Sequence, residues 1–112
     1  MTIYQKLRDA LEELQIPIKE DFFGGGETEY ITWTETGESF TFMGNDEPIN
    51  DVVGLYIHWF LPRNKKYSET ATRIRRMLLA EDFTWPKMQS VEEPDKTTRH
   101  IVFECQVERD LD

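Results

Sequence analysis

Two histidines, one cysteine and many carboxylates are the residues of this chain whose chemistry could serve a reaction or a metal. His58 and His100 fall in two apolar, strand-like segments, and Glu104 shares the alternating face of His100. Two imidazoles and a carboxylate can bind zinc, but the spacing of these three residues does not specify such a site. Histidine pairs in sheets are more often structural, so the pattern favours packing over a metal enzyme.

The remaining chemical motifs point away from catalysis. Cys105 alternates with apolar residues and reads as a small buried hydrophobe, and a single cysteine excludes an intrachain disulfide. No serine stands in a Gly-x-Ser-x-Gly elbow, and the run 24–26 lacks the Lys-Ser/Thr of a phosphate loop. The acidic stretch 46–51 lacks the glycine and glutamate positions of a calcium loop. The sequence therefore predicts no catalytic residue, no metal and no cofactor.

Length and charge restrict the class of protein. A chain of 112 residues fits one domain, residues 1–112. The formal net charge of −9 disfavours binding to nucleic acid or to an anionic membrane. No apolar run approaches the roughly 20 residues of a membrane span, and the polar N-terminus lacks a signal pattern. We expect a soluble protein made in the cytoplasm.

The first segment predicts a helix from Thr2 to Leu14, with Thr2 and Gln5 at capping-box spacing and an apolar stripe along one side. Pro17 ends it, and a loop from Glu20 to Glu27 follows. Phe22 and Phe23 precede three glycines in this loop. They form either a mobile contact loop or a buried anchor beside a simple turn, and buried anchors are the commoner case.

A β-rich segment comes next. Tyr30 to Glu35 and Ser39 to Met43 alternate like strands and predict a hairpin about the turn 36–38. A polar loop, Gly44 to Asp51, precedes Val52 to Leu61, which is apolar on both faces and therefore expected at the centre of a sheet.

The second half predicts a helix over Lys65 to Ala80 with Asn64 as its cap. An extended segment, Phe83 to Val91, is placed at a sheet edge by Pro86. The last strand runs from Thr97 to Val107, and the tail 108–112 is expected to fray. The order α-β-β-β-α-β(-β) predicts an α+β fold: a mostly antiparallel sheet of four to five strands with two helices on one face.

The charges of the chain are unevenly distributed. Acidic residues greatly outnumber basic ones before Asn50, whereas between 63 and 76 Glu69 is the only acid among many bases. One interpretation is an ordinary solvated helix face. The other is a head-to-tail contact between copies, in which the basic helix meets the acidic loops of the next copy and a ring can close. The predicted partner-interface residues are Phe22, Phe23, Asp46, Glu47, Arg63, Lys65, Lys66, Arg73, Arg75 and Arg76.

The order and texture of the segments resemble the small tail-completion proteins (tail terminator or tail-to-head joining group) of long-tailed bacteriophages and prophages. The matching segments are Leu14–Ile18, Tyr30–Glu35, Gly44–Asp46, Tyr56–Phe60 and His100–Glu104. The resemblance covers most of the chain without a single diagnostic motif. The glycine run 24–26 and the segment 83–91 have no counterpart in it.

The resemblance implies a protein without active site or cofactor that is made in the bacterial host cytoplasm. It would assemble as a ring, expected to be a hexamer, at the head-proximal end of the virion tail. Its partners would be copies of itself, the major tail tube protein and the head-completion or connector protein. The alternative from the residues is a small acidic inhibitor or immunity-type protein that caps a basic enzyme with its acidic loops around Glu20-Asp21 and Asp46-Glu47.

Overall fold

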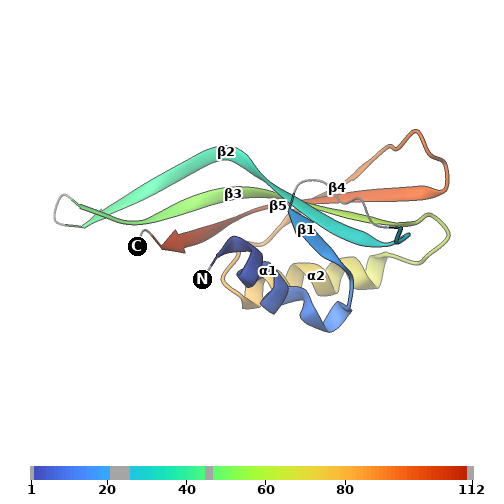
Figure 1. Cartoon of the computed structure of the whole chain (residues 1–112), viewed down its shortest axis with the longest axis horizontal. Coiled ribbons are helices and arrows are strands. Elements are labelled where there is room, and N and C mark those ends of the chain that lie inside the picture. Colours follow the sequence, from blue (N-terminus) through green and yellow to red (C-terminus); the bar gives the residue numbers. More distant parts are fainter. Residues whose placement is uncertain (1, 21–25, 45–46, 111–112) are drawn as a thin grey trace.

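The computed structural model describes residues 2–20, 26–44 and 47–110, and the side chains of these residues except 38–50 and 110. The fold is α+β, as predicted: a five-stranded mixed sheet and two helices lying on one face of it (Figure 1). The elements are α1 (Ile3–Leu11), η1 (Glu12–Leu14), β1 (Ile18–Glu20), β2 (Tyr30–Gly44), β3 (Glu47–Pro62), α2 (Ser68–Ala80), β4 (Lys87–Val91) and β5 (Thr98–Asp110).

The strand order is β1-β2-β3-β5-β4, so the apolar strand β3 is central, as predicted. Three of the four pairings are antiparallel, and β1 pairs with β2 in parallel. The short strand β1 includes Glu20, where the sequence predicted a loop to begin. It joins the sheet because Ile18 is buried and the Ile31 N–H donates to the Pro17 carbonyl at 2.8 Å.

The predicted hairpin about residues 36–38 is wrong. β2 is one continuous strand, and its partner is β3. The residues between Glu35 and Ser39 form a bulge, because Glu35 pairs with Leu55 and Ser39 with Val53. Gly37 has a φ of +88°, which a glycine adopts without steric cost, so the extra residues are absorbed inside the strand.

The predicted polar loop 44–51 is also wrong over most of its length. Glu47 to Asp51 belong to β3 and pair with β2. Polar side chains do not prevent a strand when the backbone finds a partner along its full length. Asn45 and Asp46, between the two strands, lie outside the described residues.

The two helices begin differently from each other. In α1 the predicted capping box is present: the Gln5 N–H donates to Thr2 Oγ1 at 3.1 Å, and the Thr2 N–H donates to Gln5 Oε1 at 2.9 Å. In α2 the prediction was wrong at the start, because the helix begins at Ser68 and Asn64 does not cap it. Asn64 lies in a turn closed by a hydrogen bond from the Lys65 N–H to the Pro62 carbonyl at 3.0 Å, which reverses the chain after β3.

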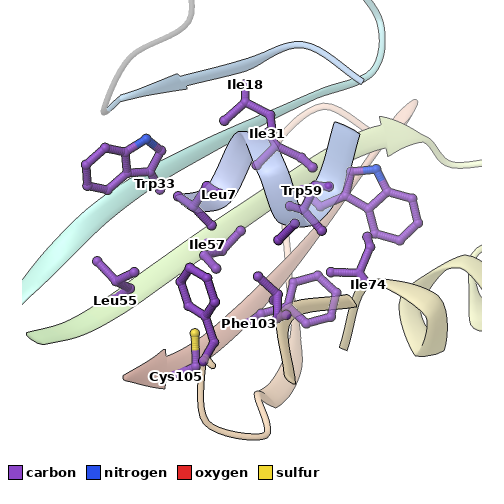
Figure 2. Close-up of a cluster of buried hydrophobic side chains, with 14 of the residues drawn as sticks. Leu7, Ile18, Ile31, Trp33, Leu55, Ile57, Trp59, Ile74, Phe103 and Cys105 are labelled. Carbon is purple, nitrogen blue, oxygen red and sulfur yellow. The ribbon is translucent and has the colours of Figure 1, made fainter. Parts of the chain in front are cut away.

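The core lies between the helices and one face of the sheet, which we call the helix face (Figure 2). The buried stripes of the helices meet it, as their periodicity predicted. Its fully buried members include Leu7, Leu11, Ile31, Leu55, Ile57, Trp59, Leu61, Ile74, Leu78, Phe83, Ile101 and Phe103. The opposite face, the open face, carries Tyr30, Tyr56, His58, Phe60 and His100 at the alternate positions.

The last two strands agree with the prediction at the sheet edge and differ from it at the C-terminal end. β4 is an edge strand, as predicted. The predicted fraying of the tail is wrong for residues 108–110, which pair with β3. The reason is local: Lys6 Nζ of α1 donates to the Glu108 carbonyl at 2.6 Å, and Arg109 pairs with Glu35 and Asp51 at 2.8 and 3.4 Å. Leu111 and Asp112 lie outside the described residues.

Candidate partner interface

The predicted basic surface divides into residues that are free to meet a partner and residues that serve the fold. Arg73 and Arg76 lie on the exposed side of α2. Arg75 instead packs back onto the protein: its guanidinium lies 4.6 Å from the Trp85 ring centroid, and its Nε donates to the Pro86 carbonyl at 3.0 Å. The helix therefore presents two outward arginines and uses the third to hold the segment before β4.

Lys65 is also engaged within the chain. Its Nζ lies 2.5 Å from Glu29 Oε1, while the indole N–H of the fully buried Trp59 donates to Glu29 Oε2 at 2.9 Å. One carboxylate thus ties the core of β3 to the turn before α2. Lys65 therefore forms an ion pair at the edge of the core. The number of charges in the sequence does not indicate this role.

Arg63 and Lys66 are exposed in the turn that leads into α2. Arg63 lies beside an open groove that also holds Asp95 and Lys96 of the β4–β5 loop. Hydrogen bonds from Thr97 and Thr98 lower the pKa of Asp95, with a smaller contribution from the charge of Arg63. The hydrogen bonds of Asp95 with Thr97 and Thr98 stabilise the β4–β5 loop, which forms one wall of the groove.

The other four predicted interface residues are two phenylalanines and two acidic residues. Phe22, Phe23 and Asp46 lie outside the described residues. Glu47 opens β3 opposite Gly44, and its side chain is not described. Of the predicted interface residues, only the basic ones therefore have described side chains.

An acidic surface that the sequence did not single out lies at the end of α1. Asp9, Glu12 and Glu13 are all exposed there. The C-terminal end of a helix carries partial negative charge, which adds to that of the carboxylates. Beside it, an open groove of about 430 Å³ runs between α1 and β1, lined by Tyr4, Arg8, Leu11, Glu12, Ile16, Pro17, Ile18 and Lys19.

Three exposed apolar side chains lie at the end of α2, before β4 and within β4. Trp85 is 48% exposed, Leu79 50% and Met88 38%. The sequence placed this segment at an edge through Pro86 but did not predict that its tryptophan faces water. The available signal was Pro86 directly before an edge strand, because a proline cannot donate to a strand ladder and therefore marks a sheet edge.

The two histidines meet on the open face. His58 Nδ1 lies 2.9 Å from His100 Nε2, and the His100 ring stacks on Phe60 at 4.2 Å between centroids. Glu93 Oε1 is 2.8 Å from His100 Nδ1, as an ion-pair contact without good hydrogen-bond alignment. The carboxylate near the pair is therefore Glu93 of the β4–β5 loop, and not Glu104, which stands opposite Tyr56 and Lys87.

Burial dominates the electrostatics of this pair. It lowers the pKa of His58, and the charge of His100 lowers it further. Burial also lowers the pKa of His100, although Glu93 opposes that shift. Both shifts favour the neutral imidazoles, which lie at hydrogen-bonding distance from each other. Across the described ranges 2–20, 26–44 and 47–110, no three His, Cys, Asp or Glu side chains are arranged to hold a metal ion.

Cys105 is buried on the helix face beside Phe103 (Figure 2), as its alternation with apolar residues predicted. Burial raises the pKa of its thiol to about 12. A thiol that stays protonated is a poor nucleophile, so the Cys105 side chain contributes to core packing.

Comparison with known proteins identifies no family for this chain. No protein-family model matches the chain, and no curated protein matches it significantly in sequence. Within the described part of the chain, no helix has the length and apolar character that crossing a bilayer requires.

Proposed function

We propose that this chain is a structural protein of phage or prophage tails, which assembles as a ring on the end of the tail tube and joins it to the head connector. The observation that carries the proposal is the placement of opposite charges on the helix layer. The acids Asp9, Glu12 and Glu13 end α1, whereas Arg73 and Arg76 face outward from α2.

The two helices lie side by side, with α1 on the β1 side of the sheet and α2 on the β4 side (Figure 1). A surface with exposed acids on α1 and outward arginines on α2 offers opposite charges to a second copy that is shifted sideways. Such a heterologous contact closes into a ring when its rotation permits. Charges of this kind orient the contact more than they strengthen it.

The shape of the molecule is compatible with such an assembly. It measures 53 × 24 × 22 Å, and the paired ends of β2 and β3 extend beyond the helices (Figure 1). A projecting pair of strands leaves the helix layer free for neighbouring copies.

The test is to mix the purified protein with tail tubes and to examine the tube ends by electron microscopy. The wild-type chain should cap the ends, and the variant Arg73→Glu/Arg76→Glu should remain folded but fail to do so. Lys96→Glu, an exposed reversal on the β4–β5 loop, is the control and should cap normally. Capping by the double variant at wild-type efficiency would contradict the charge argument.

A small acidic inhibitor is the alternative outcome of the same preparation. It would show tight one-to-one binding to a basic enzyme, no ring and no affinity for tube ends.

A further inference from the structure

We infer that Glu93, His100 and His58 form a proton relay on the open face of the sheet, which fastens the β4–β5 loop when it takes up a proton. The proton binds at the outer ring nitrogen of His58, and the positive charge comes to lie on His100, beside the carboxylate of Glu93. The relay operates within one chain, whatever that chain assembles with.

The three side chains form a continuous series of polar contacts from the loop to β3. Glu93 Oε1 lies 2.8 Å from His100 Nδ1, and His100 Nε2 lies 2.9 Å from His58 Nδ1. The His100 ring also stacks on Phe60 with 4.2 Å between centroids, which restricts its plane. His100 therefore uses both of its ring nitrogens, one toward a carboxylate and one toward a second imidazole.

These contacts define which nitrogens carry hydrogen in the neutral pair. His100 Nδ1 carries a hydrogen, because an unprotonated nitrogen at this distance would set its lone pair against the Glu93 carboxylate. In a neutral imidazole the other nitrogen is then an acceptor, so His100 Nε2 accepts the hydrogen bond that His58 Nδ1 donates. The same rule leaves His58 Nε2 without a hydrogen and able to bind a proton.

His58 is the member of the pair that solvent reaches. It is half-buried, whereas His100 is only 8% exposed. Among the described residues, His100 Nδ1 is a buried nitrogen without a well-aligned hydrogen-bond partner, and His58 Nε2 is not. Within the same residues, the side-chain hydrogen bond of His58 is the one at Nδ1. A proton from water therefore enters the pair at His58 Nε2.

Uptake of one proton reverses the hydrogen bond between the two rings. The new proton forms a bond to His58 Nε2, and the proton on His58 Nδ1 passes to His100 Nε2. His58 is then neutral and accepts through Nδ1, and His100 is a cation with a hydrogen on each nitrogen. One proton and one positive charge are added, and no heavy atom has to move.

The surroundings of the pair favour the cation on His100. Burial lowers the pKa of His100, but the charge and the hydrogen bond of Glu93 oppose that shift. A hydrogen bond between an imidazolium and a carboxylate is charge-assisted and stronger than its neutral counterpart. Neither histidine has a pKa contribution from the other titratable groups at neighbouring positions of the open face, which are Lys19 on β1, Tyr30 on β2, Tyr56 on β3, Lys87 on β4 and Glu104 on β5.

The pair takes up a single proton before it can take up a second. Burial lowers the pKa of His58, and the charge of His100 lowers it further, as expected for like charges on rings whose nitrogens are 2.9 Å apart. The two protons therefore bind in separate steps, and the second binds at a lower pH than the first.

Glu93 transmits the first proton to the β4–β5 loop. β4 ends at Val91 and β5 begins at Thr98, so Glu93 lies near the start of the loop 92–97. Asp95 stabilises the other end of the loop through its hydrogen bonds with Thr97 and Thr98. The contact between Glu93 and His100 ties the start of the loop to the sheet, and it becomes an ion pair when the relay is charged.

The experiment is nuclear magnetic resonance of the imidazole nitrogens in the 15N-labelled full chain, from pH 8 down to acid unfolding. At pH 8 both rings should carry their hydrogen on Nδ1. As the pH falls, both nitrogens of His100 should become protonated while the hydrogen of His58 moves from Nδ1 to Nε2. A hydrogen on His58 Nε2 at pH 8, a cationic His58 beside a neutral His100, or unfolding before either ring takes up a proton would overturn the relay.

The backbone amide signals of residues 92–97 test the link to the loop in the same samples. They should shift with the same midpoint as the nitrogens of His100. Glu93→Gln should lower the pH at which the pair takes up its proton and should abolish the shift of the loop amides. Glu104→Gln, which removes an exposed carboxylate opposite Tyr56, is the matched control and should titrate like the wild type. Wild-type titration in Glu93→Gln, or loop amides that do not follow His100, would overturn the inference.

Discussion

The two faces of strand β3 have similar sequences and different fates. On the helix face Leu55, Ile57 and Trp59 are fully buried. On the open face Tyr56 is 38% exposed, and His58 and Phe60 are half-buried. Both faces are apolar enough to fill a core, so hydrophobicity alone does not separate them.

What separates the two faces is the cover that each receives. The helix face is closed by α1 and α2, which exclude water over a continuous area. The open face is closed by its own side chains: Tyr30 stacks on Phe60 at 4.8 Å, Phe60 stacks on His100, and Glu93 reaches the far side of His100. The difference teaches that the open face depends on ring stacking and ionisation, whereas the helix face depends on packing.

The largest effect should come from truncating the helix face. Trp59→Ala removes a fully buried indole and the hydrogen bond that its N–H donates to Glu29 Oε2, so we expect a loss of about 3–5 kcal/mol in the free energy of unfolding. Ile57→Val, with an expected loss of about 0.5–1.5 kcal/mol, provides a measurable variant if Trp59→Ala does not fold. Urea denaturation followed by tryptophan fluorescence and circular dichroism measures both.

The matched variant on the open face is Phe60→Ala. Because part of the ring already meets water, the expected loss is about 1–2 kcal/mol. A loss equal to that of Trp59→Ala would break the comparison, since it would mean that both faces are packed cores.

An effect of similar size should arise where β3 passes the bulge of β2. A methyl group at Gly54 would come within 2.5 Å of Thr36 Oγ1, so Gly54→Ala should cost about 1–3 kcal/mol through overpacking. Thr36→Ala removes the two nearest atoms and should recover most of that loss in the double variant. A Gly54→Ala loss that is independent of residue 36 would refute the steric explanation.

The smallest expected effect is a dependence of stability on pH that belongs to the open face alone. The pKa values of His58 and His100 are lowered in the folded state from the ordinary value of 6.5. The unfolded chain therefore binds more protons just below that pH, and the free energy of unfolding should fall as the pH drops through this window and stay level above it.

The measurement is denaturant unfolding between pH 5 and pH 8. His58→Gln/His100→Gln should flatten the curve below pH 6.5. Glu93→Gln should deepen the loss at acid pH, because it removes the charge that favours a protonated His100. An unchanged pH profile in the double histidine variant would mean that the pair does not sense pH.

Much of the fold could be predicted from the sequence, because its strongest signals are local. The capping box of Thr2 and Gln5, the stripe of α2 and the central position of β3 follow from spacing and side-chain type. The predictions were wrong where one residue type suits two different local structures. Gly37 looked like a turn residue, but a glycine with positive φ serves a bulge equally well, and the long pairing with β3 decided the matter.

The candidate interface could be predicted in outline only. The basic run was visible as composition, but the roles of its members depend on residues distant in the chain: Lys65 on Glu29, and Arg75 on Trp85 and Pro86. The acidic end of α1 and the exposure of Trp85 were not predicted, because exposure depends on what the rest of the chain leaves uncovered.

By itself, the sequence determined the acidic α+β domain, the helix stripes, the alternation of the central strands and the buried, unreactive Cys105. Only the tertiary structure decided which face of β3 the helices cover, which arginines face outward and which carboxylate meets His100. The physical reason is that periodicity acts between neighbours in the chain, whereas register, cover and ion pairing join segments far apart, and many long-range arrangements satisfy the same local pattern.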